Sequence, residues 1–284
     1  MSPRARGIPW GPLIVLVILG AFAAAPALIP LDPFSQHISD RLLPPGSQGS
    51  EGQFYLLGSD ALGRDMLARL AHGARLSLLV GSSAVLGSGT IGFTLGILSG
   101  YVGGRVDRIL MRVVDLQLAF PFMILAIGVL AAVGPSVLVV IILFIFARWP
   151  AFARIVRAAT LEVKEREFVS AARALGARNL RILFLHVAPS CIGPIVVLAS
   201  FEMASIIVSE ASLGFLGVGI PPPTPTWGNM LSGGRAYLRT AWWVVVLPGL
   251  AISIVALTAN LVGDALRDYL DPKTTGARRR RGDG

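Results

Sequence analysis

The chain has 284 residues, of which 54% are hydrophobic and only 14% are charged. Because soluble domains carry about 25% charged residues, most of this chain cannot face water. Its length leaves room for about five to seven membrane-spanning helices of about 20 residues each. The formal net charge is +9, which in so apolar a chain indicates basic loops beside an anionic leaflet rather than nucleic-acid binding.

Several classes of site are absent from the sequence. The single cysteine, Cys191, excludes an intrachain disulfide and a thiolate cluster. The three histidines are scattered, and no nucleophile lies beside a base, so neither a metal site nor a membrane enzyme is expected. The only lysines, Lys164 and Lys273, follow Val163 and Pro272, so no phosphate-binding loop is present. If ATP drives this protein, the nucleotide site is on another polypeptide.

The N-terminal third is predicted to be an inner start at 1–11, a first span at 12–31 and an outer segment at 32–74. The first span could alternatively be a cleaved signal peptide, because small residues follow its apolar centre. Within the outer segment, residues 60–73 have helical periodicity, with an apolar arc formed by Leu62, Met66, Leu67 and Leu70. Ser59 is a plausible N-cap. This helix could lie on the outer membrane surface or dock a delivering protein.

Residues 75–264 are predicted to form a core of five further spans. The second span falls within 76–104, which is rich in the small residues that let helices pack closely in lipid. The third covers 116–133, and Gly134-Pro135-Ser136 separates it from a fourth span that ends near Arg157. The fifth runs from about 192 to 209 and the sixth from 240 to 263, where Trp242 and Trp243 resemble an interfacial belt.

The distribution of basic residues orients this all-α polytopic protein. With six spans and the N-terminus inside, the tail at 265–284 is also inside, and 19 of the 25 Lys and Arg residues fall in inner segments. An excess of positive charge inside is the expected arrangement. Both termini are therefore predicted to be cytoplasmic.

The longest polar interval, 165–189, lies in an inner loop at 158–190. Wound as a helix of about three turns, it places Phe168, Ala171, Ala172 and Leu175 on one narrow stripe, away from Ser170 and Arg173. Gly176 follows at the point where a turning helix needs a residue that can adopt positive φ. The helix could lie on the lipid surface or insert into a groove on a soluble partner.

Two charges fall deep inside predicted spans. Arg148 lies about 18 Å of helix beyond Ser136, and Glu202 lies about 17 Å beyond Cys191. Because a lone charge at this depth costs several kcal/mol, we predict that Glu202 faces the translocation path or a polar partner, with Arg148 near it. Arg148 could instead extend to the inner interface.

Three stretches resemble a known family. Ser170-Ala171-Ala172, Gly176 and Pro189 resemble the cytoplasmic signature loop of binding-protein-dependent ABC importer permeases, although Ser170, His186 and Ala188 stand where that pattern has Glu, Ile and Leu. The stretches 57–65, continuing to 73–78, and 210–217 are similar to the C-type permease of dipeptide, oligopeptide and nickel importers. The resemblance covers about residues 55–272.

The resemblance implies the type I ABC importer transmembrane fold in a bacterial inner membrane. It implies that the signature loop couples to an ATPase, through Phe168, Ser170, Ala171, Ala172, Arg173, Leu175, Gly176 and Arg178. Glu202, Arg148 and Glu210 are candidates for the translocation path. Implied partners are a paralogous second permease, two ATPase subunits that bind ATP and Mg²⁺, and an extracytoplasmic solute-binding protein. Peptides are the expected cargo, moved by alternating access.

An alternative function is a secondary transporter that uses Glu202 as its ion-coupling site. Transporters driven by ion gradients need ionisable groups near the membrane midplane. Only Glu202, with Arg148, could serve in that role in this sequence.

Overall fold

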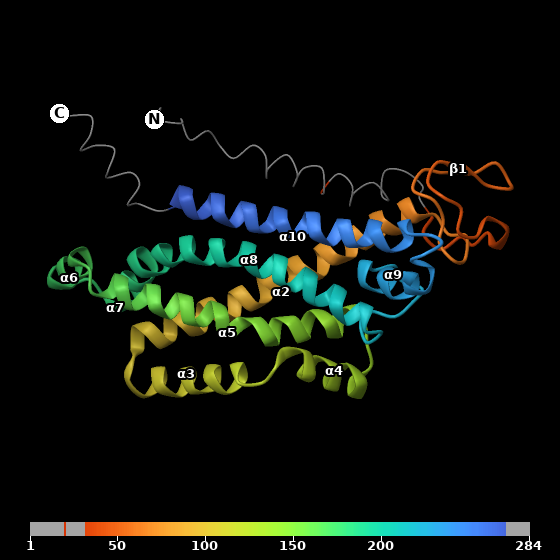
Figure 1. Ribbon diagram of the computed structural model, residues 1–284. Coiled ribbons are helices and arrows are strands. Elements are labelled where there is room, and N and C mark those ends of the chain that lie inside the picture. Colours follow the sequence, from red (N-terminus) through yellow and green to blue (C-terminus); the bar gives the residue numbers. More distant parts are fainter. Residues whose placement is uncertain (1–19, 21–31, 271–284) are drawn as a thin grey trace, which may run out of the picture. The chain divides into compact units, whose positions relative to one another are not determined.

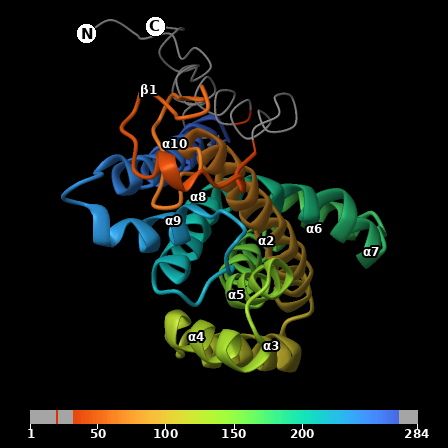
Figure 2. The ribbon, with the colours of Figure 1, turned by 90° about the vertical axis from the view of Figure 1, so that its right-hand side faces the viewer.

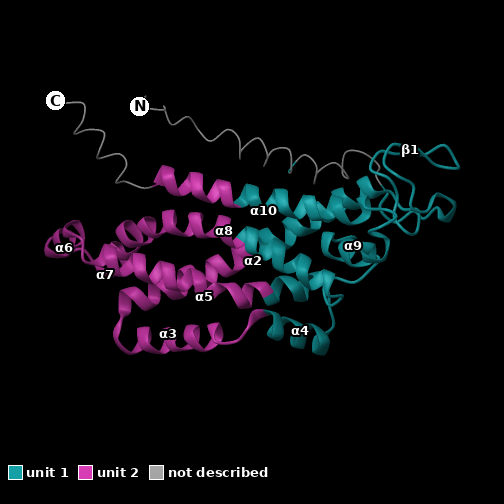
Figure 3. Ribbon diagram, in the orientation of Figure 1, with its two compact units in different colours: residues 1–83, 123–143, 203–259 teal, residues 84–122, 144–202, 260–284 magenta. Residues whose placement is uncertain are grey.

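The computed structural model describes residue 20 and residues 32–270. The expected first span at 12–31 and most of the basic tail lie outside these residues. The described chain divides into two compact units (Figure 3). Unit 1 comprises residues 32–83, 123–143 and 203–259, and unit 2 comprises residues 84–122, 144–202 and 260–270.

Long apolar helices dominate the chain, as the all-α prediction requires (Figure 1). Four of them are long and apolar enough to cross a membrane, and a bent helix pair raises the number of candidate spans in the described residues to five. The helices are α2 (Met66–Val102), α3 (Gly104–Leu118), α4 (Phe122–Val133), α5 (Val137–Lys164), α8 (Ala188–Phe215) and α10 (Trp243–Leu270).

The third predicted span, 116–133, is wrong as one continuous helix. It is divided between α3 and α4, which are bent by 81° relative to one another. Pro121 lies in the break. Proline has no N–H to donate, and it disfavours helical geometry in the residue before it. The prediction of one span was based on the apolar composition of this run. A single proline changes that composition very little, so the break was not predicted.

The segment that precedes α2, at 32–65, is an ordered loop structure that belongs to unit 1. It contains a 3-10 turn (η1, Ile38–Asp40) and a short antiparallel hairpin of β1 (Ser47–Gln48) and β2 (Phe54–Tyr55). The segment joins the first turn of α2, where the Met66 N–H donates to the Gly58 carbonyl at 3.0 Å. Figure 2 shows the hairpin beside this end of α2.

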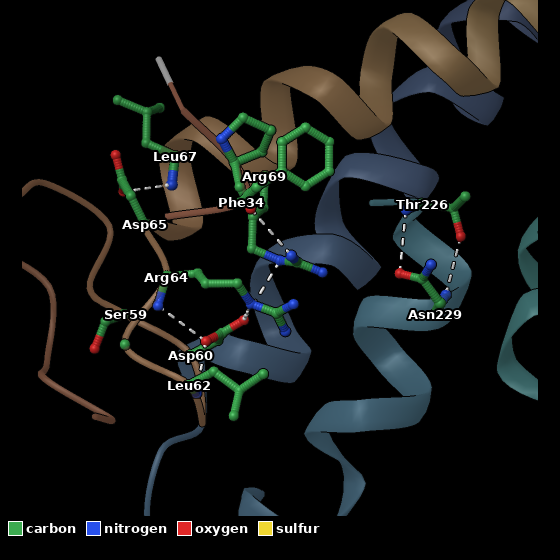
Figure 4. Close-up of polar contacts among 12 residues, drawn as sticks. Phe34, Ser59, Asp60, Leu62, Arg64, Asp65, Leu67, Arg69, Thr226 and Asn229 are labelled. Atoms are coloured by element: carbon green, nitrogen blue, oxygen red, sulfur yellow. Dashed lines mark hydrogen bonds and ion pairs between the residues drawn. The ribbon is translucent and has the colours of Figure 1, made fainter. Parts of the chain in front are cut away.

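The predicted interfacial helix at 60–73 is also wrong, because the helix begins only at Met66 and then continues without interruption to Val102. The Asp60 carboxylate accepts hydrogen bonds from the backbone N–H groups of Leu62 and Arg64 (Figure 4). Such a side-chain turn competes with helix formation. Gly63 adds a φ of +72°, which closes the turn.

Two polar residues of this segment, Ser59 and Arg69, are buried. Ser59 is not an N-cap: its hydroxyl donates to the Asp40 carbonyl and accepts from the Leu43 N–H. Arg69 does not face water, because it is 5% exposed and lies 3.4 Å from the Asp60 carboxylate (Figure 4). The segment therefore packs as part of unit 1.

The hairpin depends on an ionised Asp40. The backbone N–H of Ser50 and the hydroxyl of Tyr55 donate to its carboxylate at 2.8 and 3.2 Å. These hydrogen bonds lower the pKa of Asp40, and burial with the Asp40 contact raises the pKa of Tyr55 to about 12. A lowered folded-state pKa contributes stability that is present above the unfolded-state pKa of about 4 and is lost at lower pH.

We therefore expect the hairpin to loosen as the pH falls through the folded-state pKa of Asp40. A spin label at Gln48 should become mobile below about pH 4, and Asp40→Asn should already be mobile at pH 7. Asp32→Asn is the control, because Asp32 is exposed and its carboxylate accepts a hydrogen bond from the Phe34 N–H, two residues along the chain and outside the hairpin. Equal label mobility in the Asp40→Asn variant and the unmodified chain at pH 7 would contradict the role of Asp40.

Two buried tryptophans organise the core of unit 1. Trp227, at the start of α9 (Trp227–Gly234), donates its indole N–H to the Leu70 carbonyl at 3.1 Å. Trp243 donates to the Ser59 carbonyl at 3.1 Å and is 6% exposed. The predicted interfacial belt is thus half wrong: Trp242 is 53% exposed, whereas Trp243 belongs to the protein core.

Small residues bring α2 against α5 in unit 2. Gly92, Gly96 and Gly100 recur every four residues and face backbone or side-chain atoms of Trp149–Thr160. A Cβ at Gly96 would lie 2.7 Å from the Ala153 carbonyl oxygen. This spacing is the small-residue pattern that lets membrane helices approach closely, as the composition of this run predicts.

Candidate coupling helix and membrane-embedded charges

The signature stretch forms a short helix with a glycine-terminated end. α6 (Glu167–Ala174) has eight residues, so the predicted three turns are too many. At its C-terminus Gly176 has a φ of +82°, its N–H donates to the Arg173 carbonyl at 3.0 Å, and the Ala177 N–H donates to the Ala172 carbonyl at 3.1 Å. These two bonds define a Schellman motif, which confirms the predicted turn at Gly176.

The apolar stripe of α6 lies on the surface of unit 2. Leu175 is 89% exposed and Phe168 is 43% exposed. Ser170, Ala171 and Arg173 are also exposed. Figures 1 and 2 show α6 and the following α7 (Asn179–Ile182) projecting from one end of unit 2. Within the described residues, therefore, the apolar face of α6 is available to another molecule.

The residue that anchors α6 is Val169, which sequence reasoning missed. Val169 is fully buried in a cluster with Val163, Ile182 and Val187, and Ala172 packs against this cluster from the next turn. The spacing of Val169 and Ala172, three residues apart, was a usable signal for an inward face. Phe168 and Leu175, which lie about 100–120° around the helix from Val169, remain exposed.

Contacts beyond α6 fix the rest of the loop. Arg178 is exposed and precedes α7, and its carbonyl accepts from the Ile182 N–H at 3.1 Å. The Tyr101 hydroxyl donates to the Asn179 carbonyl at 2.9 Å. A π-helical turn (η2, Leu183–Val187) then leads into α8, and its His186 ring contacts Phe168 edge-on at 5.8 Å. The loop is thus tied to the C-terminal end of α2 and to the N-terminal end of α8.

A bidentate ion pair holds α3 to α5 near this loop. The Arg157 guanidinium donates to both oxygens of Asp107, at 2.5 and 2.7 Å, and the Ser99 hydroxyl also donates to Asp107. Sequence reasoning missed this pair. Asp107 is the one acidic residue among the arginines at 105–112, which was a signal for a structural role.

The two membrane-embedded charges are paired, as predicted. The Arg148 guanidinium on α5 lies 3.4 Å from the Glu202 carboxylate on α8, and their side chains are 22% and 12% exposed. The Phe122 ring lies under the Arg148 guanidinium at 5.4 Å. Because Glu202 has a charged neighbour in unit 2, it is not a lone charge facing lipid.

Glu210 differs from this pair. It belongs to unit 1, is 3% exposed, and accepts one hydrogen bond from the Ser77 hydroxyl at 3.3 Å. Its burial against α2 supports a packing contact between α2 and α8. A place for Glu210 on the translocation path stays a prediction.

These features define a polytopic α-helical membrane component with an exposed short helix, α6, whose apolar side chains Phe168 and Leu175 are uncovered. The chain belongs to the family of binding-protein-dependent transport system inner membrane components, whose family model matches residues 92–276. Its place is therefore in a membrane. Members of this family work with a separate ATPase and further permease components, generally together with a binding protein. The chain is the membrane subunit and not itself an enzyme.

Relatives extend the similarity over nearly the whole chain. The Di/tripeptide transport system permease protein DppC of Pseudomonas aeruginosa (strain UCBPP-PA14) is 44% identical over 96% of this chain and 90% of its own length. The Dipeptide transport system permease protein DppC of Escherichia coli (strain K12) is 44% identical over 95% of this chain and 90% of its own length.

Solved structures share the fold. The inward-facing MetNI methionine ABC transporter matches 71% of this chain and 97% of its own chain, with a TM-score of 0.55 at 20% identity. A crystal structure of an amino acid ABC transporter with histidines matches 71% of this chain and 94% of its own chain, with a TM-score of 0.55 at 13% identity. The predicted type I ABC importer fold is thus confirmed.

Proposed function

We propose that this chain is a permease subunit of an ATP-driven importer that moves di- or oligopeptides into the cytoplasm by alternating access. The names of relatives that are 44% identical over almost the entire chain support peptides as cargo. The observation that carries the coupling role is the exposed apolar face of α6, a helix anchored by Val169 and terminated by Gly176. A secondary transporter built on Glu202 is not favoured.

The proposed assembly pairs this chain with a second, paralogous permease and two ATPase subunits. ATP and Mg²⁺ bind on the ATPase subunits and not on this chain. An extracytoplasmic binding protein delivers the peptide, and both termini of this chain are cytoplasmic. Closure of the ATPase pair pulls α6 and thereby moves α5 and α8, because the loop between them contains α6.

The test is to purify the tagged chain in mild detergent from the cells that naturally make it, and to identify the proteins that co-purify with it. We expect the unmodified chain to recover an ATPase and a second permease, and Leu175→Asp to lose at least about 90% of the ATPase, because one buried charge at an apolar interface costs several kcal/mol. Leu62→Asp is the matched control, since Leu62 is 39% exposed but lies in the outer segment.

Two results would overturn the proposal. Recovery of the unmodified chain without an ATPase would contradict its place in an ABC importer. Full ATPase recovery with Leu175→Asp would contradict the docking of α6 and favour a helix that lies on lipid.

A further inference from the structure

The Arg148–Glu202 pair lies close to the middle of its two helices. Glu202 is about 20 Å from both ends of α8, and Arg148 is about 16 Å from the start of α5, at a rise of 1.5 Å per residue. Neither side chain is fully covered, since they are 22% and 12% exposed. Charged groups at this depth avoid lipid and face a bundle interior or a water-filled cavity. Their exposed atoms therefore face the interior of the helix bundle or a water-filled cavity and not lipid.

The pair is loose. The closest approach of guanidinium nitrogen and carboxylate oxygen is 3.4 Å, longer than the usual 2.7–2.9 Å of a charge-assisted hydrogen bond. The Glu202 oxygen in this contact, Oε2, is shielded from solvent and accepts no hydrogen bond from the described residues. A mid-membrane carboxylate that is held by such a loose ion pair is able to exchange this contact for one with another cationic group.

Specific contacts fix the part of α5 that carries Arg148. Pro150 lies inside α5, two residues further along, and it leaves the Phe146 carbonyl without its helical donor. The Gln117 side-chain amide donates to that carbonyl. The Phe122 ring lies 5.4 Å from the guanidinium and 5.2 Å from the Phe144 ring. Gln117 and Phe122 thus hold this part of α5 and orient its guanidinium.

We infer that Arg148 and Glu202 form a subsite for the two charged ends of a small peptide on its way through the membrane. This inference rests on the proposed function. The guanidinium binds the C-terminal carboxylate of the peptide, in the planar geometry that favours Arg for this task, and the Glu202 carboxylate binds the N-terminal ammonium.

Without cargo, the two groups neutralise one another at 3.4 Å. A dipeptide about 7 Å long separates them and replaces one ion pair with two. Arg148, Glu202 and both charged ends of the dipeptide are then each paired with an opposite charge. Because the subsite contacts only the chain ends of the peptide, it does not select among peptide side chains.

A thermodynamic cycle between protein and peptide tests the subsite. The complex is purified with its ATPase and second permease but without the soluble binding protein, and binding of dialanine is measured by equilibrium dialysis. In the unmodified complex, we expect amidation of the peptide carboxylate to weaken binding by about tenfold, the effect of losing one charge-assisted hydrogen bond. In Arg148→Gln, the same amidation should change binding by less than about twofold.

The other end of the peptide gives a second cycle. N-acetylation of dialanine should weaken binding to the unmodified complex by about tenfold and have almost no further effect in Glu202→Gln. The matched controls are Arg154→Gln and Glu162→Gln, which remove one partner from the exposed pairs Arg154–Asp115 and Arg166–Glu162. Both controls should respond to amidation and acetylation as the unmodified complex does.

The outcomes separate this inference from the proposed function. If amidation weakens binding equally in the unmodified complex and in Arg148→Gln, the pair is only a structural contact and the inference fails. It also fails if the unmodified complex imports peptide from the loaded binding protein but does not bind dialanine. Absence of both ATPase and peptide uptake would instead refute the proposed function.

Discussion

Gly96→Leu is expected to abolish folding of unit 2. A Cβ at this position would lie 2.7 Å from the Ala153 carbonyl oxygen and 2.7 Å from the Val156 Cβ, and the leucine adds three further carbons. Because the obstructing atoms are backbone and branched side chain, α2 and α5 must separate. Overpacking by single methylenes already costs about 1–3 kcal/mol, and domains are stable by only about 5–15 kcal/mol.

The measurement is the yield of monodisperse protein after solubilisation, together with its melting temperature. We expect Gly96→Leu to reduce the yield at least about tenfold, and Gly96→Ala to lower stability by about 1–3 kcal/mol. Gly128→Leu is the matched control, because a Cβ added at Gly128, in α4, would meet no described atom within 4 Å. Equal yields of Gly96→Leu and Gly128→Leu would show that α2 and α5 do not pack through this glycine.

The helices of the membrane core could be predicted because apolar runs and their punctuation are local properties of the sequence. Gly134-Pro135-Ser136 separates α4 from α5 at the predicted place. The pairing of Arg148 with Glu202 could also be predicted, since helical rise converts residue number into depth and two opposite charges at one depth favour contact. Both inferences use only distances along a regular helix.

The failures arise where a single side chain overrides periodicity. Residues 60–73 have a helical pattern, but the Asp60 carboxylate accepts hydrogen bonds from the backbone N–H groups of Leu62 and Arg64. This side-chain turn replaces the first part of the predicted helix. Similarly, the Asp107–Arg157 pair joins residues 50 positions apart. No local pattern specifies such a contact, because it depends on how α3 packs against α5.

Packing, and not the hydrophobic pattern of the sequence, also determines which face of α6 is buried. Phe168 and Leu175 form the more apolar stripe, yet Val169 is the buried residue. Hydrophobicity alone would place the larger side chains inside. The exposure of Phe168 and Leu175 is explained if another subunit covers them in the assembled importer. The sequence of this chain alone contains no information about such a subunit.

Gly176→Val is expected to uncouple ATP hydrolysis from peptide uptake. Gly176 has a φ of +82°, which a β-branched residue adopts only with strain of about 1–3 kcal/mol. The space around Gly176 is open within the described residues, so the effect is one of backbone geometry and not of a clash. The Schellman bonds from Gly176 and Ala177 weaken, and the angle at which α6 leaves the loop changes.

Uptake and ATP hydrolysis are measured in the same proteoliposomes, with the full importer and its loaded binding protein. We expect Gly176→Val to lower the peptide imported per ATP by at least about tenfold, which corresponds to about 1.4 kcal/mol of lost coupling. Gly176→Asn should retain most of the peptide imported per ATP, because Asn tolerates the left-handed region of backbone conformation. Gly193→Val is the control for bulk, because Gly193 is a helical position at which an added Cβ would lie 3.8 Å from the Leu270 Cδ1, an ordinary contact distance. If Gly176→Asn and Gly176→Val lower the peptide imported per ATP equally, the positive φ at position 176 does not set the direction of α6. The ATPase would then contact the loop only through the side chains of the loop.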